Sequence, residues 1–432
     1  MSEVDAVVIG GGPAGAAASA WLAGWGYRVS VFEKARFPRF HVGESLVPGV
    51  NDLLWELGLD EKIERAGFQV KRGGNLTSHS GAYVKFHLSL IQDQLRKPYT
   101  FQVLRSRFDE ILLDHSRERG ASVHEETEVT SLLREGERVV GVEVASAGHP
   151  ARTVRAPIVV DASGRDGFIA SRLRLRRRDR QLNKVSIWGH FHGVRRDPGP
   201  DEGNLIAAVF GRGWFWIIPL AGGATSVGAV VDAVAMKGGR QAPEERFGRF
   251  VDECPFVADR MRGAAQIGPL ETVSNLAYGA TRFAGPGYVL VGDAAIFLDP
   301  IYSYGVYLAL KTGKVVAERI RDGFETGALS PASFEPYETA VRREVQVVFT
   351  QIYNWYRFIG DRERVDRFVP LMVRWVTLRR SFSLLFSGMY DQLDPEGPSA
   401  MIQLLKKPLA TPPAKGPLVL AAMTDSQATR DH

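Results

Sequence analysis

The chain has 432 residues, which exceeds the length of a typical single core and predicts two or three interleaved domains. An apolar content of 45% and a charged content of 24% are ordinary for a soluble globular protein. The formal net charge of +5 is modest, and the single cysteine, Cys254, excludes an intramolecular disulfide.

Several classes of protein are not expected from this sequence. It contains no Cys/His cluster with metal-ligand spacing, so no metal site is predicted. No apolar run reaches the roughly 18 residues that a membrane-spanning helix needs. The start, "MSEVDAVVIGGG", lacks the basic region of a signal peptide and runs directly into a predicted strand. These features favour a cytoplasmic protein.

The first predicted elements are a strand, a tight turn, a helix and a second strand, in "DAVVIGGGPAGAAASAWLAGWGYRVSVFEK" (5–34). Gly10, Gly12 and Gly15 have the G-x-G-x-x-G spacing that turns the chain, brings the backbone close to a pyrophosphate and packs the helix on the strand. Glu33 ends the second strand, where it is placed to accept hydrogen bonds from a ribose hydroxyl. This pattern predicts dinucleotide binding. The acidic side chain of Glu33 argues against NADP as the bound nucleotide.

Two later strands also end in an acid that small residues follow. They are "APIVVDASG", with Asp161, and "GYVLVGDAA", with Asp293. An acid in this position suits contacts to ribitol hydroxyls, where two backbones must come close. Between the first fingerprint and these strands, "VLRSRFDEILLDHSRERG" predicts an amphipathic helix that begins near Arg105.

The basic residues gather in "SRLRLRRRDR" (171–180). This run is either a solvated loop or a docking surface for an acidic partner, such as a phosphopantetheine carrier protein or a reductase. No recognised nucleic-acid motif accompanies it, so nucleic acid is not an expected partner.

The central and C-terminal segments differ in pattern. "NKVSIWGHFHGV", "NLIAAVF", "GWFWIIPL" and "ATSVGAVVDA" read as strands, several with the alternation of a half-covered antiparallel sheet. Residues 331–395 are helical and rich in aromatic residues, which predicts packing in a core. The Pro/Ala-rich end from Lys406 predicts a flexible tail.

The fingerprint and the two acids together resemble the FAD-binding fold of the aromatic hydroxylase and flavin-dependent halogenase superfamily, over about residues 1–330. Four segments resemble the flavin-dependent halogenases in particular, in the family's order. They are "FPRFHVGESLVPG" (37–49), "GFQVKRGG" with Lys71, "GWFWIIP" as W-x-W-x-I-P, and "FLDPIYSYG" (297–305) as F-x-x-P-x-x-S-x-G.

The resemblance implies an α/β fold. A Rossmann-like FAD-binding domain is expected to be interleaved with an antiparallel β-sheet substrate domain and followed by C-terminal helices. The expected boundaries are 1–80, 100–175 and 275–330 for the FAD-binding domain, 81–99 and 176–274 for the substrate domain, 331–405 for the helical region and 406–432 for the tail.

The resemblance also implies the residues of the site. Lys71, Trp214, Trp216 and Ser303 stand at the positions that the family uses in catalysis, and the amides of Tyr304 and Gly305 are expected to hold the halide. The expected FAD contacts are Gly10, Gly12, Pro13, Ala14, Gly15, Glu33, Lys34, Arg39, Gly43, Glu44, Ser45, Arg105, Val129, Asp161, Gly164, Gly292, Asp293, Pro300, Gly305 and Val306.

The chemistry that the resemblance implies begins with reduced FAD and O₂, which form a C4a-hydroperoxide. Chloride or bromide attacks this oxidant and releases hypohalous acid. Lys71 then holds the oxidant, by a hydrogen bond or as a chloramine, and presents it to the acceptor. The indoles of Trp214 and Trp216 are suited to keep the acceptor away from the flavin.

One departure from the family pattern bears on the acceptor. Halogenases that act on tryptophan have a glutamate directly before the motif serine, and here Tyr302 occupies that position. An electron-rich phenol or pyrrole, free or tethered to a carrier protein, is therefore the expected acceptor, in natural-product (antibiotic) biosynthesis. No second G-x-G-x-x-G unit is found, which leaves open a separate NAD(P)H-dependent flavin reductase as a partner.

Two alternatives stay open. A flavin monooxygenase or reductase of the same fold would lack halogenating activity, and Lys71 with the tryptophan pair argues against it. A non-catalytic binding protein on this fold is disfavoured by the intact phosphate and ribose signatures.

Overall fold

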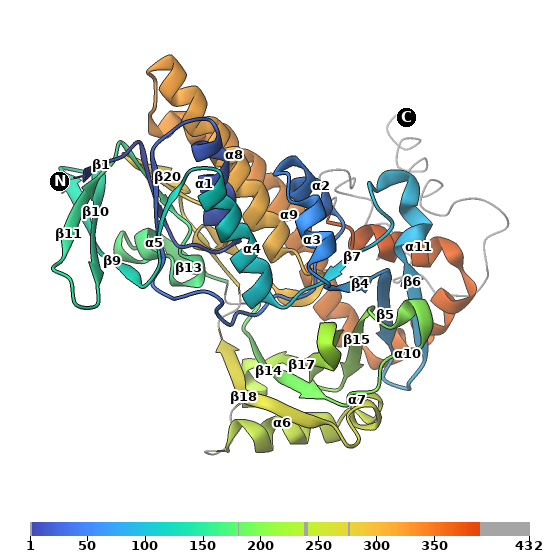
Figure 1. The fold of residues 1–432 in the computed structure, drawn as a ribbon. Coiled ribbons are helices and arrows are strands. Elements are labelled where there is room, and N and C mark those ends of the chain that lie inside the picture. The colour runs from blue at the N-terminus through green and yellow to red at the C-terminus, as the bar shows by residue number, and fades with distance from the viewer. Residues whose placement is uncertain (1, 180, 237–240, 275–276, 389–432) are drawn as a thin grey trace, which may run out of the picture. The chain divides into compact units, whose positions relative to one another are not determined.

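The computed structural model describes residues 2–179, 181–236, 241–274 and 277–388 (Figure 1). The described residues divide into a first unit, with segments 2–69, 101–183 and 277–343, and a second unit, with segments 70–100, 184–274 and 344–388. Three elements run across a boundary between the units: β4 (Gln69–Lys71), β7 (Thr100–Gln102) and α9 (Glu335–Ile359). The predicted tail, 406–432, lies outside the described residues.

The first unit is built on a six-stranded sheet with the order β20-β21-β12-β2-β3-β8. Five of these strands are parallel, and only β20 runs antiparallel to its neighbour. The central strands are short, apolar and buried at every residue, as expected where both faces of a parallel sheet are covered. The strands are β2 (Ala6–Ile9), β3 (Val29–Phe32), β8 (Ser122–His124), β12 (Ile158–Asp161), β20 (Ala284–Gly285) and β21 (Tyr288–Leu290).

Helix α1 (Pro13–Gly24) packs against both α4 (Arg105–Glu118) and α8 (Gly305–Thr326). Its sequence, PAGAAASAWLAG, is almost entirely buried, because small side chains let neighbouring elements approach closely. Gly15 is essential to this packing, since a Cβ atom there would lie 2.0 Å from the carbonyl oxygen of Gly10. The other helices of the first unit are α2 (Gly49–Glu56), α3 (Asp60–Arg65) and α5 (Phe168–Arg172).

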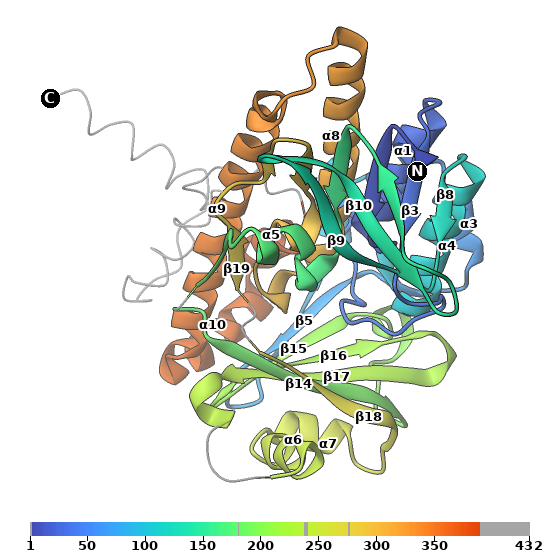
Figure 2. The same cartoon turned by 90° about the vertical axis from the view of Figure 1, so that its left-hand side faces the viewer.

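Two smaller sheets complete the first unit. The long β9–β10 hairpin, visible in Figure 2, belongs to a four-stranded sheet of β1 (Ser2–Glu3), β9 (Thr127–Glu135), β10 (Arg138–Ser146) and β11 (Arg152–Arg155). A three-stranded sheet contains β13 (Arg176–Arg178), β19 (Tyr278–Ala280) and β22 (Ile296–Phe297). Strand β13 is an edge strand of that sheet, and β22 leads directly into the segment before α8.

The second unit is built on a seven-stranded sheet with the order β18-β14-β17-β16-β15-β5-β6. All neighbours are antiparallel except β5 and β15, which are parallel. The strands are β5 (Gly73–Thr77), β6 (Tyr83–His87), β14 (Lys184–His192), β15 (Leu205–Phe210), β16 (Gly213–Pro219), β17 (Ala224–Asp232) and β18 (Ala265–Ser274).

Both faces of the central strands of this sheet are covered. Phe215 and Ile217 of β16 point to one face, which forms a core with Phe247 and Phe250 of α6. Figure 2 shows α6 (Pro243–Asp252) and α7 (Pro255–Arg260) beneath that face. On the other side, α10 (Arg362–Arg374) and α11 (Val376–Leu385) contact β6. The expected half-covered sheet is therefore wrong in the centre, because β15 is buried at all six residues and its sequence, LIAAVF, has no polar side to expose.

The aromatic stripe at 331–395 packs as core over the part that the structure describes. Trp355, Phe358, Phe368 and Phe382 are all buried, and the ring of Phe382 lies 6.0 Å from that of Phe86 in β6. No described helix is both long enough and apolar enough to cross a bilayer. Short 3-10 segments connect the elements: η1 (Leu88–Gln94), η2 (Gly164–Asp166), η3 (Gly199–Asp201), η4 (Ala221–Gly223), η5 (Ala233–Met236), η6 (Gly292–Ala294), η7 (Pro300–Tyr302) and η8 (Pro331–Phe334).

A glycine in β17 makes room for two indoles of the neighbouring strands. Gly228 pairs with Trp216 of β16 on one side and with Trp188 of β14 on the other. A Cβ atom at Gly228 would lie 2.2 Å from Cζ2 of Trp216 and 2.5 Å from Cβ of Trp188. The indoles occupy the space that any larger residue would need.

We expect Gly228→Ala to destabilise the protein by about 1–3 kcal/mol, because the added methyl group overpacks the indoles. Gly248→Ala is the matched control. A Cβ atom at Gly248 in α6 meets nothing within 4 Å, so alanine there should stabilise the helix by about 0.5–1 kcal/mol. Urea unfolding of both variants measures the difference. Equal effects would show that residue 228 has no packing constraint.

Candidate active site

The predicted phosphate-binding turn lies between β2 and α1 and contains Gly10, Gly12, Pro13, Ala14 and Gly15. No side chain caps the N-terminus of α1, so its first N–H groups are available to an anion.

Glu33 holds this turn from the end of β3. Its side chain is buried, and its Oε2 atom accepts a hydrogen bond of 2.8 Å from the backbone N–H of Gly11. Its Oε1 atom accepts one of 2.9 Å from the N–H of Ala35. A carboxylate has about four acceptor positions, so the side chain keeps capacity for the predicted ribose contact.

A buried carboxylate, Asp109, binds two of the predicted arginines. Nε of Arg105 donates to Oδ1 of Asp109 at 2.7 Å, and Nη2 donates to Oδ2 at 2.9 Å. Nη1 of Arg39 lies 3.2 Å from Oδ2 of the same group. Arg105 is 5% exposed, so it is a buried arginine and not a surface one. Sequence reasoning missed Asp109, although it lies four residues after Arg105 on the buried face of α4.

Arg105 also holds the segment that the sequence assigns to one flavin edge. Its Nη1 atom donates to the carbonyl oxygen of Val42 at 2.7 Å and to that of Gly43 at 3.3 Å. Directly after these residues, the backbone of Glu44 accepts from Val103, and Ser45 forms a bridge with Gln102. Residues 42–45 are therefore fixed to the start of α4 by side-chain and backbone contacts.

The two acids at strand ends have different surroundings. Asp161 is fully buried, and its carboxylate accepts hydrogen bonds from the N–H groups of Ser163 and Ile169. Burial raises the pKa of Asp161, while these hydrogen bonds act against the rise. They also show that its carboxylate organises the turn into α5.

Asp293 is partly exposed, and positively charged side chains lie near it. Desolvation raises its pKa to about 6, and the positive charges of Arg165, Arg105 and Arg176 oppose that rise. The preceding Gly292 donates its N–H to Oγ1 of Thr312 in α8 at 2.9 Å. The second acid is thus anchored to α8.

The segment "FLDPIYSYG" forms a tight corner before α8. Oδ1 of Asp299 accepts a hydrogen bond of 3.0 Å from the N–H of Ile301 and so caps η7. Ser303 follows with φ 54° and ψ 31°, a left-handed conformation that costs a non-glycine residue about 1–2 kcal/mol. Helix α8 then begins at Gly305.

The rings of this corner point into the protein. Tyr302 and Tyr304 are each 2% exposed, and burial raises the pKa of Tyr302, with a smaller contribution from Asp299. Gly305 differs, because a Cβ atom there would meet nothing within 4 Å. The N-terminus of α8 therefore has open space beside its first residue.

Three remaining predicted contacts lie in different settings. Lys34 forms an ion pair with Asp166, and both side chains are largely exposed. Val129 is buried in β9, and Gly164, at the start of η2, has a φ of 62°.

The second unit contains the other predicted catalytic residues. Lys71, the last residue of β4, is 2% exposed. Burial lowers the pKa of its amine to about 7 from an ordinary value of 10.5. At neutral pH a substantial fraction of this amine is therefore uncharged and nucleophilic.

Trp214 and Trp216 lie on one face of β16, and their ring centroids are 6.1 Å apart. Nε1 of Trp216 donates to Oγ of Ser226 at 3.1 Å, and Nε1 of Trp214 donates to the hydroxyl of Tyr356 in α9 at 3.3 Å. Trp188, which the sequence reading did not select, lies 6.5 Å from Trp216. The pair is thus part of a buried group of three indoles.

A narrow apolar cavity lies on the second unit's sheet. Trp355 of α9, which borders it, is 4% exposed, and its Nε1 atom has no hydrogen-bond partner among the described residues. The cavity is lined by Asn75, Leu76, Phe86, Leu205, Ala207, Trp355, Phe382 and Phe386. The cavity has room for about one water molecule, and no polar atom is exposed to it.

The structure thus gathers the predicted residues into two sets. In the first unit, the glycine turn, Glu33, the arginine pair, Asp293 and the corner before α8 come from segments far apart in the chain. The buried Glu33, the uncapped start of α1 and the open space at Gly305 fit a dinucleotide with a flat ring system. Within the described residues, no group of three potential ligands could hold a metal ion.

Comparisons with known proteins agree with these features. A family profile described as an FAD binding domain matches residues 3–339. The 1H-pyrrole-2-carbonyl peptidyl-carrier-protein chlorinase of Pseudomonas fluorescens is 34% identical over 410 residues, which cover 89% of this chain and 89% of that protein.

Two further proteins are similar. Tryptophan 2-halogenase of Chondromyces crocatus is 35% identical over 325 residues, 74% of this chain and 61% of the halogenase. The structure of the flavin-dependent brominase Bmp2 matches 94% of this chain and 100% of the brominase, with a TM-score of 0.81 and 27% identity.

We expect Asp109→Asn to weaken FAD binding at least tenfold, because Arg39 and Arg105 lose the charge that orients them, and to destabilise the protein by about 3 kcal/mol. Asp114→Asn is the matched control, since Asp114 lies on the same helix, is half-exposed and pairs only with Arg117. Flavin fluorescence titration measures the affinity. An unchanged dissociation constant for Asp109→Asn would contradict the orienting role.

Proposed function

Because this chain belongs to the flavin-dependent halogenases, we propose that it chlorinates or brominates an electron-rich aromatic ring, of pyrrolyl or phenolic type, held on a carrier protein. The comparisons confirm the predicted family and the α/β fold with its parallel FAD-binding sheet, antiparallel sheets and C-terminal helices. The observation that carries the proposal is the buried amine of Lys71, in the unit that also holds the tryptophan pair.

The residues of the first unit fit FAD. The glycine turn and the start of α1 would hold the diphosphate, Glu33 the ribose, and Arg39 and Arg105 the flavin edge. When bound in reduced form, FAD supplies, with O₂, the oxidising equivalent that converts a halide to hypohalous acid.

The start of α8 supports the proposed halide site. The amides of Tyr304 and Gly305 lie at the positive end of a 22-residue helix, whose first N–H groups have no partner within the helix. Open space at Gly305 leaves room for an anion. Ser303 directly precedes these two residues in the chain.

Lys71 would transfer the halogen. In one route, its neutral Nζ atom attacks the halogen of hypohalous acid, so that an N–halogen bond forms, the O–halogen bond breaks, and hydroxide leaves with an amine proton as water. The ring carbon of the acceptor then takes the halogen, and the ring proton returns to the amine. In the other route, the amine only hydrogen-bonds the acid. Either route explains a lysine that is buried at a cost.

The acceptor is inferred from two features. Tyr302 supplies no carboxylate to assist an unactivated indole, so a self-activating pyrrole or phenol is favoured. The chlorinase of Pseudomonas fluorescens acts on a pyrrole that is bound to a peptidyl carrier protein.

An exposed arginine surface supports a carrier-bound acceptor. We define it as Arg172 at the end of α5, Arg174 in the following turn and Arg177 in β13. All three are exposed, and the side chains of Arg172 and Arg177 donate only to backbone carbonyl oxygens. No described carboxylate pairs with any of the three, so their charges complement an acidic protein. Arg180, which belongs to the same run, lies outside the described residues.

The proposed function is tested by mass spectrometry of reactions with FAD, a flavin reductase, NADH and bromide or chloride. Carrier-bound pyrroles and phenols are compared with the free compounds, and a thioether traps any hypohalous acid. We expect a halogenated carrier-bound product. Hydroxylated product regardless of halide would replace the proposal with a monooxygenase.

We expect Lys71→Met to lower halogenated product at least 100-fold, while trapped hypohalous acid and NADH-linked flavin turnover stay unchanged. In the wild type, product formation should rise as pH increases through about 7, because the free amine is required. A Lys71→Met protein with full halogenation would end the assignment.

The same variant should also change how the free energy of unfolding depends on pH. From pH 7 to 10.5 the unfolded lysine binds a proton that the folded one lacks, so wild-type stability rises with pH across this window. Lys71→Met removes this pH dependence. We expect the free energy of unfolding of the variant to exceed that of the wild type by about 2–4 kcal/mol at pH 6.5 and by less at pH 9. Urea unfolding at the two pH values measures it.

We expect the triple variant Arg172→Gln, Arg174→Gln, Arg177→Gln to raise KM for the carrier-bound acceptor about tenfold at low salt, with kcat unchanged. Salt should raise KM of the wild type and have little effect on the variant. Arg65→Gln, Arg138→Gln, Arg212→Gln removes the same charge from other exposed positions and is the control.

Two further arms identify what docks on the arginine surface. The wild type and both triple variants should turn over a small free phenol at the same rate. Chemically reduced FAD in place of the reductase should leave the KM difference intact, whereas its disappearance would assign the surface to the reductase. Equal KM values for the two triple variants would contradict a docking role.

A further inference from the structure

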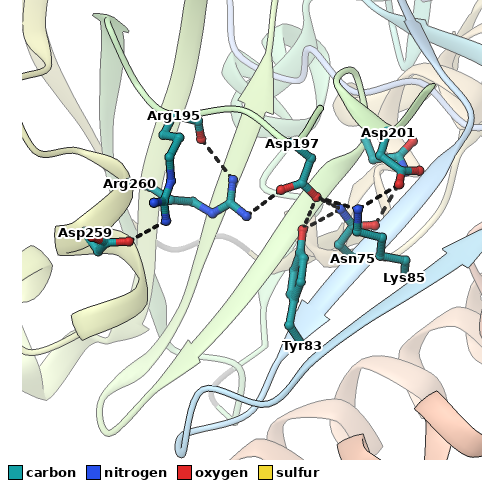
Figure 3. A network of polar contacts seen from close by, with 9 residues as sticks. Asn75, Tyr83, Lys85, Arg195, Asp197, Asp201, Asp259 and Arg260 are labelled. Atoms are coloured by element: carbon teal, nitrogen blue, oxygen red, sulfur yellow. Dashed lines mark hydrogen bonds and ion pairs between the residues drawn. The ribbon is translucent and has the colours of Figure 1, made fainter. Parts of the chain in front are cut away.

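The second unit contains a network of polar side chains that the proposed halogen transfer does not use (Figure 3). Its members come from β5, β6, the connection between β14 and β15 (193–204), and α7. They are Asn75, Tyr83, Lys85, Arg195, Asp197, Asp201, Asn204, Asp259 and Arg260. Asn75, Asp197, Asn204 and Arg260 are buried, and burying polar groups is costly unless each is paired.

Asp197 is the centre of the network. Its Oδ2 atom accepts from the hydroxyl of Tyr83 at 2.6 Å and from Nδ2 of Asn75 at 3.0 Å, and its Oδ1 atom accepts from Nη2 of Arg260 at 2.6 Å. Burial alone would raise the pKa of Asp197, but hydrogen bonds from Tyr83 and Arg260 outweigh it and lower the pKa. The carboxylate therefore stays ionised and fixes its donors.

A second carboxylate continues the network toward Asn204. Nζ of Lys85 lies 2.7 Å from Asp201 and 3.4 Å from Asp197, so this ammonium group joins the two acids. Oδ1 of Asp201 accepts from Nδ2 of Asn204 at 3.1 Å. The backbone carbonyl oxygen of Asp201 also accepts from the N–H of Asn204.

Asn204 then connects the network to Lys71. Its Oδ1 atom accepts a hydrogen bond of 3.1 Å from the backbone N–H of Arg72. That N–H belongs to the peptide unit whose carbonyl carbon is that of Lys71, and this unit is planar and rigid. The carbonyl oxygen of Arg72 is held as well, by the N–H of Leu88 at 2.9 Å. The side chain of Asn204 is 1% exposed, so water does not compete for these bonds.

The orientation of the Asn204 amide is determined by its partners. A backbone N–H can only donate, and an ionised carboxylate can only accept. The amide oxygen must therefore face Arg72 and the amide nitrogen must face Asp201. The Asn204 side chain thus joins the carboxylate of Asp201 to the Lys71–Arg72 peptide by two hydrogen bonds.

The network is suited to hold the Lys71 peptide rigidly. Transfer of a halogen from an amine requires that amine to be held within about 0.5 Å of its reacting position. A paired, largely buried network that contacts the Lys71–Arg72 peptide meets that requirement.

We propose that Asn204 is a positioning residue for Lys71, whose backbone it holds in place by anchoring the Lys71–Arg72 peptide to Asp201 and the Asp197 network. The proposal rests on the proposed function of Lys71 in halogen transfer. Asn204 touches no reacting atom, and it acts through the backbone of its partner.

The first test needs neither flavin nor acceptor. A small amine-reactive reagent labels the purified protein over a range of pH, and peptide mass spectrometry follows Lys71. In the wild type, the midpoint of Lys71 labelling as a function of pH should lie near 7. Asn204→Ala frees the end of β4 and admits water to the amine, so the midpoint should rise by one unit or more toward 10.5.

One variant separates positioning from general stability. Lys85→Met removes a cation from the same network and leaves the amide–peptide bond intact, so it should lower the melting temperature without moving the midpoint. Should Asn204→Ala not fold, Asp201→Asn weakens the anchor of the same amide and should shift the midpoint in the same direction.

The second test uses the complete reaction. For Asn204→Ala, the ratio of halogenated product to trapped hypohalous acid should fall about tenfold. An unchanged midpoint in Asn204→Ala, or an equal shift in Lys85→Met, would overturn the proposal. If wild-type protein makes no halogenated product, the proposed function fails, while the labelling profiles still decide whether Asn204 positions Lys71.

Discussion

The exclusion of water from one amine is the constraint on which the proposed chemistry of this protein depends. Lys71 would be protonated at neutral pH in solvent, and burial alone brings its pKa to about 7. Lys71 is 2% exposed at the end of β4, which pairs with β7 in a two-stranded sheet. The hydrogen bond from the N–H of Arg72 to Asn204 connects that end of β4 to the polar network.

The sequence predicts the parts of the molecule that are local in the chain. The strand, glycine turn, helix and acid at 5–34 lie within one supersecondary unit, so their spacing is enough to predict their geometry. The corner at 297–305 is predicted for the same reason. Arg105 was selected by resemblance, but its burial could not be read from the chain, because it depends on a carboxylate whose importance appears only once α4 is placed.

What the sequence could not predict are contacts between distant segments. Asn204 meets the peptide of Lys71 across more than a hundred residues, and no motif marks it. Trp188 joins the tryptophan pair only because β14 and β16 flank the glycine of β17. The half-covered sheet was expected because alternation in single strands was taken as exposure, whereas a sheet between two layers of helices buries both of its sides.

The corner before α8 has a consequence for how residue 303 should be regarded. Ser303 adopts a left-handed backbone, which glycine adopts freely and serine adopts at a conformational cost. If this position served only to turn the chain, glycine would adopt the same backbone conformation at a lower free-energy cost. The folded state instead retains an oxygen at an energetic disadvantage, immediately before a helix N-terminus. The strain therefore weighs against a purely architectural serine and favours one whose hydroxyl group is itself in use.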